Sequence, residues 1–377
     1  MFTHTESSWV GFGSLVVGFL VSWATCLLIV RTQHWHGRFT LDGQHGKQKV
    51  HTLPTPRIGG LALALGLLAA VLWARWNAFK PADVEFQHLL GSLCLSASPA
   101  FVVGFIEDIT KSVSVKARLI ATAASGIMLV LFTGHWVTHV SVPGLDTLLL
   151  MYPVGMVFTA FAVAGIANSV NIIDGFNGLA GGVVVLMLLT IAAIAYRVDD
   201  ATIFQMALLG AVVTFGFLLL NYPRGSLFLG DAGAYGLGFY VAALAVLLAE
   251  RNIGEVSPWA MLLVCGYPFI ETMFSIYRRL SRKKKGNPGQ PDALHLHSLV
   301  YRRLISRHLL RGAPAWQRNA FTAPIMWVYA AVPMMGAITW PESFAMVAAW
   351  LAFSAVVYLR IYRKLLSFSL FTHKTTG

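Results

Sequence analysis

Long runs of apolar residues recur along the whole chain and constrain its fold more than any other feature. A helix needs about 20 mainly apolar residues to cross the hydrocarbon core of a bilayer. About eleven runs come close to that length, and no linker or soluble-sized segment interrupts them. We therefore expect one all-α polytopic membrane domain over residues 1–377. The expected spans are 9–30, 58–76, 88–106, 117–133, 148–168, 179–196, 203–221, 234–249, 258–276, 321–338 and 343–362.

Composition supports a membrane protein and excludes other classes. The chain is 56% hydrophobic and 12% charged, whereas soluble proteins carry about 25% charged residues. The net charge is +12, but the sequence shows no soluble basic segment with interleaved aromatic residues, so we do not expect nucleic acid as a partner. Cys26, Cys94 and Cys265 lie inside apolar runs, which favours packing over disulfides or zinc. The segment 135–148 alternates weakly around Pro143-Gly144, which predicts a small hairpin.

The distribution of Lys and Arg predicts the orientation. Eleven spans place the two termini on opposite sides. All but four of the 28 basic residues fall on one side, in the loops 31–57, 107–118, 222–233 and 278–320 and in the tail from Arg360. The exceptions are Arg75, Lys80, Arg197 and Arg251. Because basic loops stay in the cytoplasm, we expect an external N-terminus, a cytoplasmic C-terminus and a cytoplasmic basic loop at 278–320.

Four acidic residues stand at ends of spans on that basic side: Glu107, Asp108, Asp174 and Asp231. A carboxylate near the bilayer is costly unless it is paired with a cation or reaches water. A salt bridge would explain any one of them alone. Several acids at separate helix ends can instead converge on one cleft and bind a cation. Hard oxygen ligands favour Mg²⁺ or Mn²⁺ over zinc.

Glycine and amide residues surround these acids. "NSVNIIDGFNGLAGG" begins at Asn168, and "NYPRGSLFLGDAGAYGLG" begins at Asn221. Glycines let backbone N–H groups approach an anion, and a following helix offers a positive N-terminus. Close packing of helices is the alternative reading. In "DALHLHSLVYRR", His295 and His297 are weak evidence for a metal site, and with nearby arginines they could bind phosphate.

In this order the segments resemble the polyprenyl-phosphate N-acetylhexosamine-1-phosphate transferase superfamily (glycosyltransferase family 4). The matching elements are Lys49-x-His51, "PTPRIGG", the acidic pair with Lys111, "NxxNxxDG", the stretch from Asn221 to Asp231, "PFIET" and the His-x-His segment. Eleven spans and an external N-terminus look like the undecaprenyl-phosphate N-acetylglucosamine branch. The resemblance implies Mg²⁺-dependent transfer of HexNAc-1-phosphate, chiefly GlcNAc-1-phosphate, from a UDP-sugar to undecaprenyl phosphate. UMP is the leaving group. The resemblance further implies that the reaction takes place at the cytoplasmic face of the bacterial inner membrane and is the first membrane step in making a cell-envelope polysaccharide.

The resemblance also implies residue roles. It assigns catalysis to Asp108, Asp174, Glu107, Lys111, His295 and His297, substrate binding to Lys49, Arg57, Asn168, Asn171, Gly175, Asn177, Asn221 and Phe228, and metal binding to Asp231. Asp108 is a general base or a structural partner in this scheme. Glu107 replaces the usual first Asp of the acidic pair with a longer side chain. Ser298 stands where many relatives have another His.

Several alternatives stay open at this point. The donor could be UDP-N-acetylfucosamine, UDP-N-acetylquinovosamine or the muramoyl-pentapeptide nucleotide. A transporter would place polar groups near the middle of the membrane, whereas the acids here sit at one face, and a scaffold subunit would not explain the ordered motifs. The sequence does not decide the polysaccharide pathway or whether the protein forms a homodimer. It also does not decide between direct attack by the lipid phosphate and a covalent aspartyl intermediate.

Overall fold

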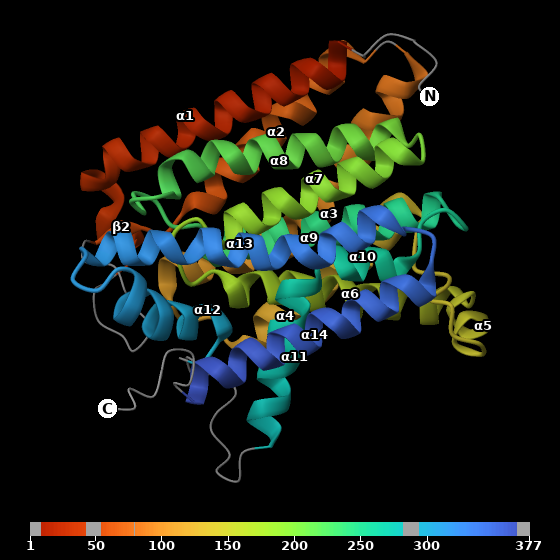
Figure 1. Ribbon diagram of the computed structural model, residues 1–377. Coiled ribbons are helices and arrows are strands. Elements are labelled where there is room, and N and C mark those ends of the chain that lie inside the picture. The colour runs from red at the N-terminus through yellow and green to blue at the C-terminus, as the bar shows by residue number, and fades with distance from the viewer. Residues whose placement is uncertain (1–8, 43–53, 79, 282–293, 368–377) are drawn as a thin grey trace.

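The computed structural model describes residues 9–42, 54–78, 80–281 and 294–367, and in these ranges the chain is almost entirely helical (Figure 1). Two strands of two residues each, β1 (Leu41–Asp42) and β2 (Thr55–Pro56), pair antiparallel. The helices are α1 (Trp9–Thr40), α2 (Gly59–Asn77), α3 (Pro81–Thr110), α4 (Val115–Thr133), α5 (Leu145–Leu149), α6 (Tyr152–Ile173), α7 (Leu179–Arg197), α8 (Ala201–Asn221), α9 (Gly230–Arg251), α10 (Pro258–Val264), α11 (Gly266–Leu280), α12 (Leu296–Leu299), η1 (Val300–Leu309), α13 (Ala315–Thr339) and α14 (Phe344–Ser367).

The expected all-α polytopic membrane fold is confirmed. Ten helices in the described ranges are long and apolar enough to span a membrane. The expected run 258–276 is instead broken into α10 and α11, which meet at an angle of 82°. Pro268 lies in the first turn of α11, where its missing N–H and its ring favour a break from the preceding helix.

The broken pair still crosses from one end of the bundle to the other. At its start, the Ser257 N–H donates to the Pro341 carbonyl in the turn between α13 and α14, at 2.7 Å. Near its end, Arg279 lines the same cavity as Asp174, the residue that follows α6. The pair therefore serves as an eleventh crossing.

Helix α9 is the central element of the bundle. In its most apolar stretch 94% of the residues are buried, against 17% in α14, which runs along the outside. Close packing at its N-terminal end depends on small residues: a Cβ on Gly60 of α2 would collide with the backbone of Gly233. Small residues allow membrane helices to approach at backbone distance, and here they bring α2 and α3 against the start of α9.

The predicted hairpin at 135–148 is wrong. The segment is irregular and ends in the short helix α5. Side chains bind its backbone groups in place of a partner strand: the Val137 N–H donates to Thr159 Oγ1 at 2.8 Å, and the Val140 N–H donates to Asp146 Oδ1 at 2.7 Å. Because these side chains satisfy the backbone N–H groups, the segment needs no hydrogen bonds to a second β-strand, despite its weak alternation of polar and apolar residues.

The basic segment 278–320 is helical over most of its described part, which contains α12, η1 and the start of α13. Residues 282–293 lie outside the described ranges, as do Lys49 and His51. The small sheet lies at the same end of the bundle as α12. There the Arg57 N–H donates to the Thr40 carbonyl at 2.9 Å, and the Phe228 N–H donates to the Pro56 carbonyl at 2.8 Å. These bonds hold the segment before α2 against the end of α1 and the turn before α9.

Candidate active site

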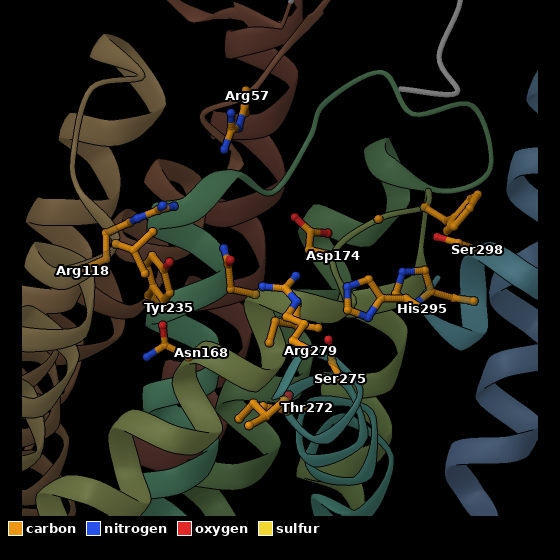
Figure 2. A pocket seen from close by; sticks show the side chains of 17 residues that line it. Arg57, Arg118, Asn168, Asp174, Tyr235, Thr272, Ser275, Arg279, His295 and Ser298 are labelled. Carbon is orange, nitrogen blue, oxygen red and sulfur yellow. The ribbon is translucent and has the colours of Figure 1, made fainter. Parts of the chain in front are cut away.

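A cavity of about 550 Å³ opens at the end of the bundle where α6 ends and α4 and α9 begin. Figure 2 shows its polar lining. Arg57, Arg118 and Arg279 come from three different segments, and Asp174 is the acidic residue that lines the cavity with them. Guanidinium groups bind phosphate oxygens through directed N–H donors, so the three arginines make the cavity suitable for an anionic ligand such as a diphosphate.

Asp231, in the first turn of α9, is held by three donors. Its Oδ1 accepts hydrogen bonds from Arg57 Nη2 at 2.7 Å and from Asn171 Nδ2 at 3.2 Å. Its Oδ2 accepts one from Arg118 Nη1 at 2.8 Å. The segment before α2, helix α4 and helix α6 therefore converge on one carboxylate, which sets the positions of two cavity arginines.

Asp108 is fully buried at the C-terminal end of α3. Its carboxylate accepts hydrogen bonds from the backbone N–H groups of Asp231, at 2.7 Å, and Ala232, at 3.0 Å. Arg57 Nε lies 3.3 Å from its Oδ1. A carboxylate at a helix N-terminus satisfies free N–H groups and complements the helix dipole. This geometry corresponds to the structural partner, one of the two roles expected for Asp108.

A glycine is required where α9 begins. Gly230 has φ +76°, and a Cβ there would collide with the Arg57 carbonyl and with the Asp108 carboxylate. Any other residue would strain the backbone and push α3 away. The glycine of "GDAG" thus allows the contact between Asp108 and the start of α9.

Asp174 follows α6 directly. No described residue donates a hydrogen bond to its carboxylate, and it lines the cavity with Asn168 and Asn171. Burial raises the pKa of Asp174 to about 7; Arg57 opposes the rise, and Asp231 adds to it. Near neutral pH this carboxylate can either carry a proton or bind a cation.

The oxygen donors around the cavity fit a hard divalent cation. Asn168 and Asn171 use their N–H groups in hydrogen bonds to Thr122 and Asp231, so their amide oxygens remain available beside Asp174. Among the described residues, no three acidic, His or Cys side chains are close enough to enclose a metal. Mg²⁺ commonly uses one or two carboxylates and completes its shell with water and substrate phosphate. The donor set fits that mode of binding.

Both histidines of the His-x-His segment reach the cavity. Their rings stack at 5.3 Å, and His297 Nδ1 lies 3.1 Å from the Tyr267 hydroxyl. Burial lowers the pKa of His297 to about 3, against the opposing effect of Glu271, so this imidazole is neutral at pH 7. Its Nε2 lies 3.2 Å from the point where a Cβ on Gly175 would stand, which places it beside the backbone at the cavity wall.

Three residues expected to bind substrate do not line the cavity. Asn221 Oδ1 accepts from the Gly178 N–H at 2.6 Å, and its Nδ2 donates to the Leu227 carbonyl at 2.8 Å. Asn177 Nδ2 donates to the Pro223 carbonyl at 3.1 Å. The backbone of Phe228 binds the segment before α2. In this structure Asn177 and Asn221 join the loops after α6 and α8, while Gly175 lines the cavity itself.

Glu107 and Lys111 stabilise the turn after α3. Glu107 Oε2 accepts from the Val113 N–H at 2.7 Å. Lys111 adopts a left-handed conformation (φ 55°), and its Nζ donates to the Leu41 carbonyl at 3.2 Å. Neither side chain lines the cavity. The longer reach of Glu107 brings it to the turn.

Five polar lining residues were not predicted from the sequence: Arg118, Tyr235, Thr272, Ser275 and Arg279. The last three follow one face of α11 at helical spacing, a signal that the sequence did contain. Arg118 was attributed to the basic side of the membrane, and its distance in sequence from Asp231 hid the pairing.

The sequence model of Glycosyl transferase family 4 matches residues 90–249, from α3 to α9. This stretch contains Asp108, Asp174 and Asp231. Over this stretch the chain is similar to glycosyl transferase family 4. This similarity agrees with the multi-pass membrane fold and with the ordered motifs around the cavity.

Proteins similar to this chain come from several bacteria. It is 29% identical to a probable undecaprenyl-phosphate N-acetylglucosaminyl 1-phosphate transferase of Bacillus subtilis (strain 168), over 75% of this chain and 76% of that one. It is 28% identical to the undecaprenyl-phosphate alpha-N-acetylglucosaminyl 1-phosphate transferase of Thermotoga maritima, over 68% and 72%. It is also 28% identical to a phospho-N-acetylmuramoyl-pentapeptide-transferase of Synechococcus, over 69% and 74%.

Proposed function

We propose that this protein transfers GlcNAc-1-phosphate from UDP-GlcNAc to undecaprenyl phosphate and releases UMP. The supporting observation is the cavity at one end of the helical bundle, where three arginines, two imidazoles and the carboxylate of Asp174 surround a space for an anion. The relatives named for N-acetylglucosaminyl 1-phosphate transfer support this sugar over the muramoyl-pentapeptide. The reaction belongs at the cytoplasmic face of the bacterial plasma membrane, where UDP-sugars are available, as the first step of an envelope polysaccharide.

The reaction is a direct phosphoryl transfer. An oxygen of the lipid phosphate bonds to the β-phosphorus of the UDP-sugar, and the bond from that phosphorus to the bridging oxygen breaks. UMP leaves with the electron pair. A phosphate monoester has a second pKa near 6, so the attacking oxygen is largely ionised at pH 7 and needs no general base. Both carboxylate oxygens of Asp108 accept hydrogen bonds from backbone N–H groups at the start of α9. We therefore assign Asp108 a structural role rather than that of a general base.

The protein contributes positioning and charge, on which phosphoryl transfer largely depends. Arg57, Arg118 and Arg279 offset the repulsion between the lipid phosphate and the diphosphate. His297, neutral and held by Tyr267, can donate Nε2–H to the ligand. Asp174 and Asp231, with the amide oxygens of Asn168 and Asn171, would hold Mg²⁺ or Mn²⁺. When bound, the cation would neutralise diphosphate charge and polarise the phosphoryl group.

Purified protein in detergent tests the proposal. With UDP-GlcNAc, undecaprenyl phosphate and Mg²⁺ we expect equal amounts of UMP and lipid-linked sugar diphosphate, and loss of both on chelation. A preference for UDP-N-acetylfucosamine, UDP-N-acetylquinovosamine or the muramoyl-pentapeptide nucleotide would reassign the donor. Uptake of intact UDP-GlcNAc into proteoliposomes without UMP release would replace the transferase with a transporter.

A further inference from the structure

A buried acid that the proposed reaction does not use lies beside the His-x-His segment. Glu271 of α11 is fully buried, with a relative exposure of 0%. Its Oε1 accepts from His295 Nδ1 at 2.9 Å and from the Tyr358 hydroxyl at 3.0 Å. The Leu296 N–H donates to Oε2 at 3.1 Å and to Oε1 at 3.3 Å. One carboxylate thus joins α11, the first turn of α12 and α14.

These contacts explain how a charge is tolerated in the protein interior. A buried carboxylate is strongly unfavourable unless hydrogen-bond donors or a cation surround it. Here an imidazole, a backbone amide and a phenol supply them. Removing the carboxylate would leave the Leu296 N–H without an acceptor and His295 without its partner.

The orientation of His295 follows from this pairing. An ionised carboxylate only accepts hydrogen bonds, so Nδ1 of His295 carries a proton. Fixing one ring nitrogen fixes the direction of the other, and His295 lines the cavity. His297, stacked on His295, is held at its own Nδ1 by Tyr267 of α11. Both imidazoles are therefore oriented by side chains from α11.

We propose that Glu271 is a positioning residue that holds the His-x-His segment against the cavity, with Tyr358 of α14 completing its hydrogen bonding. It acts on the donor substrate through His295 rather than by contact with the reacting atoms. The inference rests on the proposed transferase function. Glu271, His295 and Tyr358 all lie beyond residues 90–249, which the family model matches.

The first test compares hydroxyl and carboxylate variants by steady-state kinetics with each substrate varied in turn. Losing a hydrogen bond to a charged group costs about 1.5–3 kcal/mol, so Glu271→Gln should lower kcat/KM for the UDP-sugar about 10- to 150-fold. The KM for undecaprenyl phosphate should stay within about 2-fold. Tyr358→Phe should cause a smaller loss. Tyr329→Phe is the matched control, because its hydroxyl binds the Ser354 carbonyl at 3.3 Å and not Glu271.

A double-mutant cycle separates positioning from a general structural role. If Glu271 acts through His295, Glu271→Gln combined with His295→Ala should be no slower than His295→Ala alone. Additive losses in the double mutant would overturn the proposal. So would an active wild type whose turnover Glu271→Gln matches. Glu271→Asp keeps the charge with a shorter reach and should recover part of the activity. Thermal melting in detergent identifies any variant that fails to fold.

Calorimetric binding of UDP-GlcNAc repeats the cycle without turnover. We expect Glu271→Gln and His295→Ala to weaken binding to a similar extent and without additivity. If the wild type releases no UMP, the transferase function fails, and the binding cycle still decides the role of Glu271. Independent effects of the two substitutions on binding would overturn the positioning role whichever reaction the protein performs.

Discussion

Asp231 determines where the arginines of the cavity stand, because Arg57 and Arg118 both bind its carboxylate. We expect Asp231→Asn to reduce transfer by roughly 100-fold or more, the scale seen when one charge-stabilising group is removed from an active site. The loss follows from misplaced arginines and a missing cation ligand. UMP release and thermal melting measure it. Asp83→Asn, a buried acid in the first turn of α3, is the control that should keep activity.

Near-normal turnover of Asp231→Asn at saturating Mg²⁺ would contradict the assignment of metal binding to this residue.

The adjacent acids Glu107 and Asp108 should respond very differently to substitution. Glu107→Asp shortens a side chain that accepts a hydrogen bond from the Val113 N–H, and should cost about 1 kcal/mol of stability. Asp108→Asn removes a buried charge paired with Arg57 and two backbone groups, so it should cost more and lower turnover strongly. Melting temperature and kcat compare them. A greater loss for Glu107→Asp would show that the longer side chain is the essential one.

The raised pKa of Asp174 predicts a pH dependence. The carboxyl ionises near pH 7, above its ordinary 3.8. At limiting Mg²⁺, kcat/KM for the UDP-sugar should therefore rise toward pH 7 and then level off. Because the lipid phosphate also titrates near pH 6, the comparison with Asp174→Asn is needed, and the variant should lack the part of the rise centred near 7. An unchanged profile in the variant would exclude Asp174 as its source.

The same shift affects stability, with a defined sign. A group whose pKa is raised on folding stabilises the protein below its unfolded pKa, and this contribution disappears as pH rises through the folded value. Without divalent cations the contribution of Asp174 to stability should therefore be lost between about pH 4 and 7, and the difference in stability between wild type and Asp174→Asn measures it. Mg²⁺ should restore it above pH 7 by favouring the ionised form.

At the scale of single residues, the sequence predicted the acids better than their partners. Acidic residues are rare in this chain and stand at span ends, so Asp108, Asp174 and Asp231 could be found by position. Arg118 lies 113 residues from Asp231 in sequence, and no local pattern connects them. The roles of Asn177 and Asn221 as loop ties likewise depend on backbone carbonyls brought together only by folding.

At the scale of elements, apolar runs located the helices but not their ends. Helix α1 continues to Thr40, ten residues beyond the expected end, because a helix can continue through polar residues while hydropathy marks only its apolar part. The break between α10 and α11 was missed because each half is apolar. A hydropathy pattern measures composition, and it does not distinguish a straight span from two helices that meet at an angle near a proline.

His297 lies in the short helix α12 and His295 directly precedes it, and His297 gives a prediction at this scale. His297→Ala should lower kcat/KM for the UDP-sugar by about 10- to 150-fold, because a donor to a charged ligand is lost. His295→Ala should act in the same direction, and the KM for undecaprenyl phosphate should change much less. His135→Ala is the control. His135 follows α4, and its ring hydrogen-bonds to the Thr133 carbonyl. A loss confined to the lipid substrate would move α12 to the acceptor side.

At the scale of the whole molecule, the orientation predicted by the basic loops can be tested with two labels. Ser112 follows α3 at the cavity end, and Glu255 lies in the turn after α9 at the opposite end; both are exposed. In a Cys94→Ala background, Glu255→Cys should react with an impermeant maleimide on intact cells. Ser112→Cys should react only after permeabilisation. The reverse result would place the cavity outside the cell, away from UDP-sugars.

The length of α1 has a consequence for the depth of the molecule in the bilayer. Its 32 residues extend about 48 Å, whereas the hydrocarbon core is about 30 Å thick. Roughly the last third must therefore stand among the headgroups, a region that suits its exposed Trp35. Thr40, its last residue, accepts the hydrogen bond from the Arg57 N–H. Helix α1 thus acts as a spacer that holds Arg57 at headgroup height, where a phosphate can meet it while the attached lipid chain stays in its own leaflet.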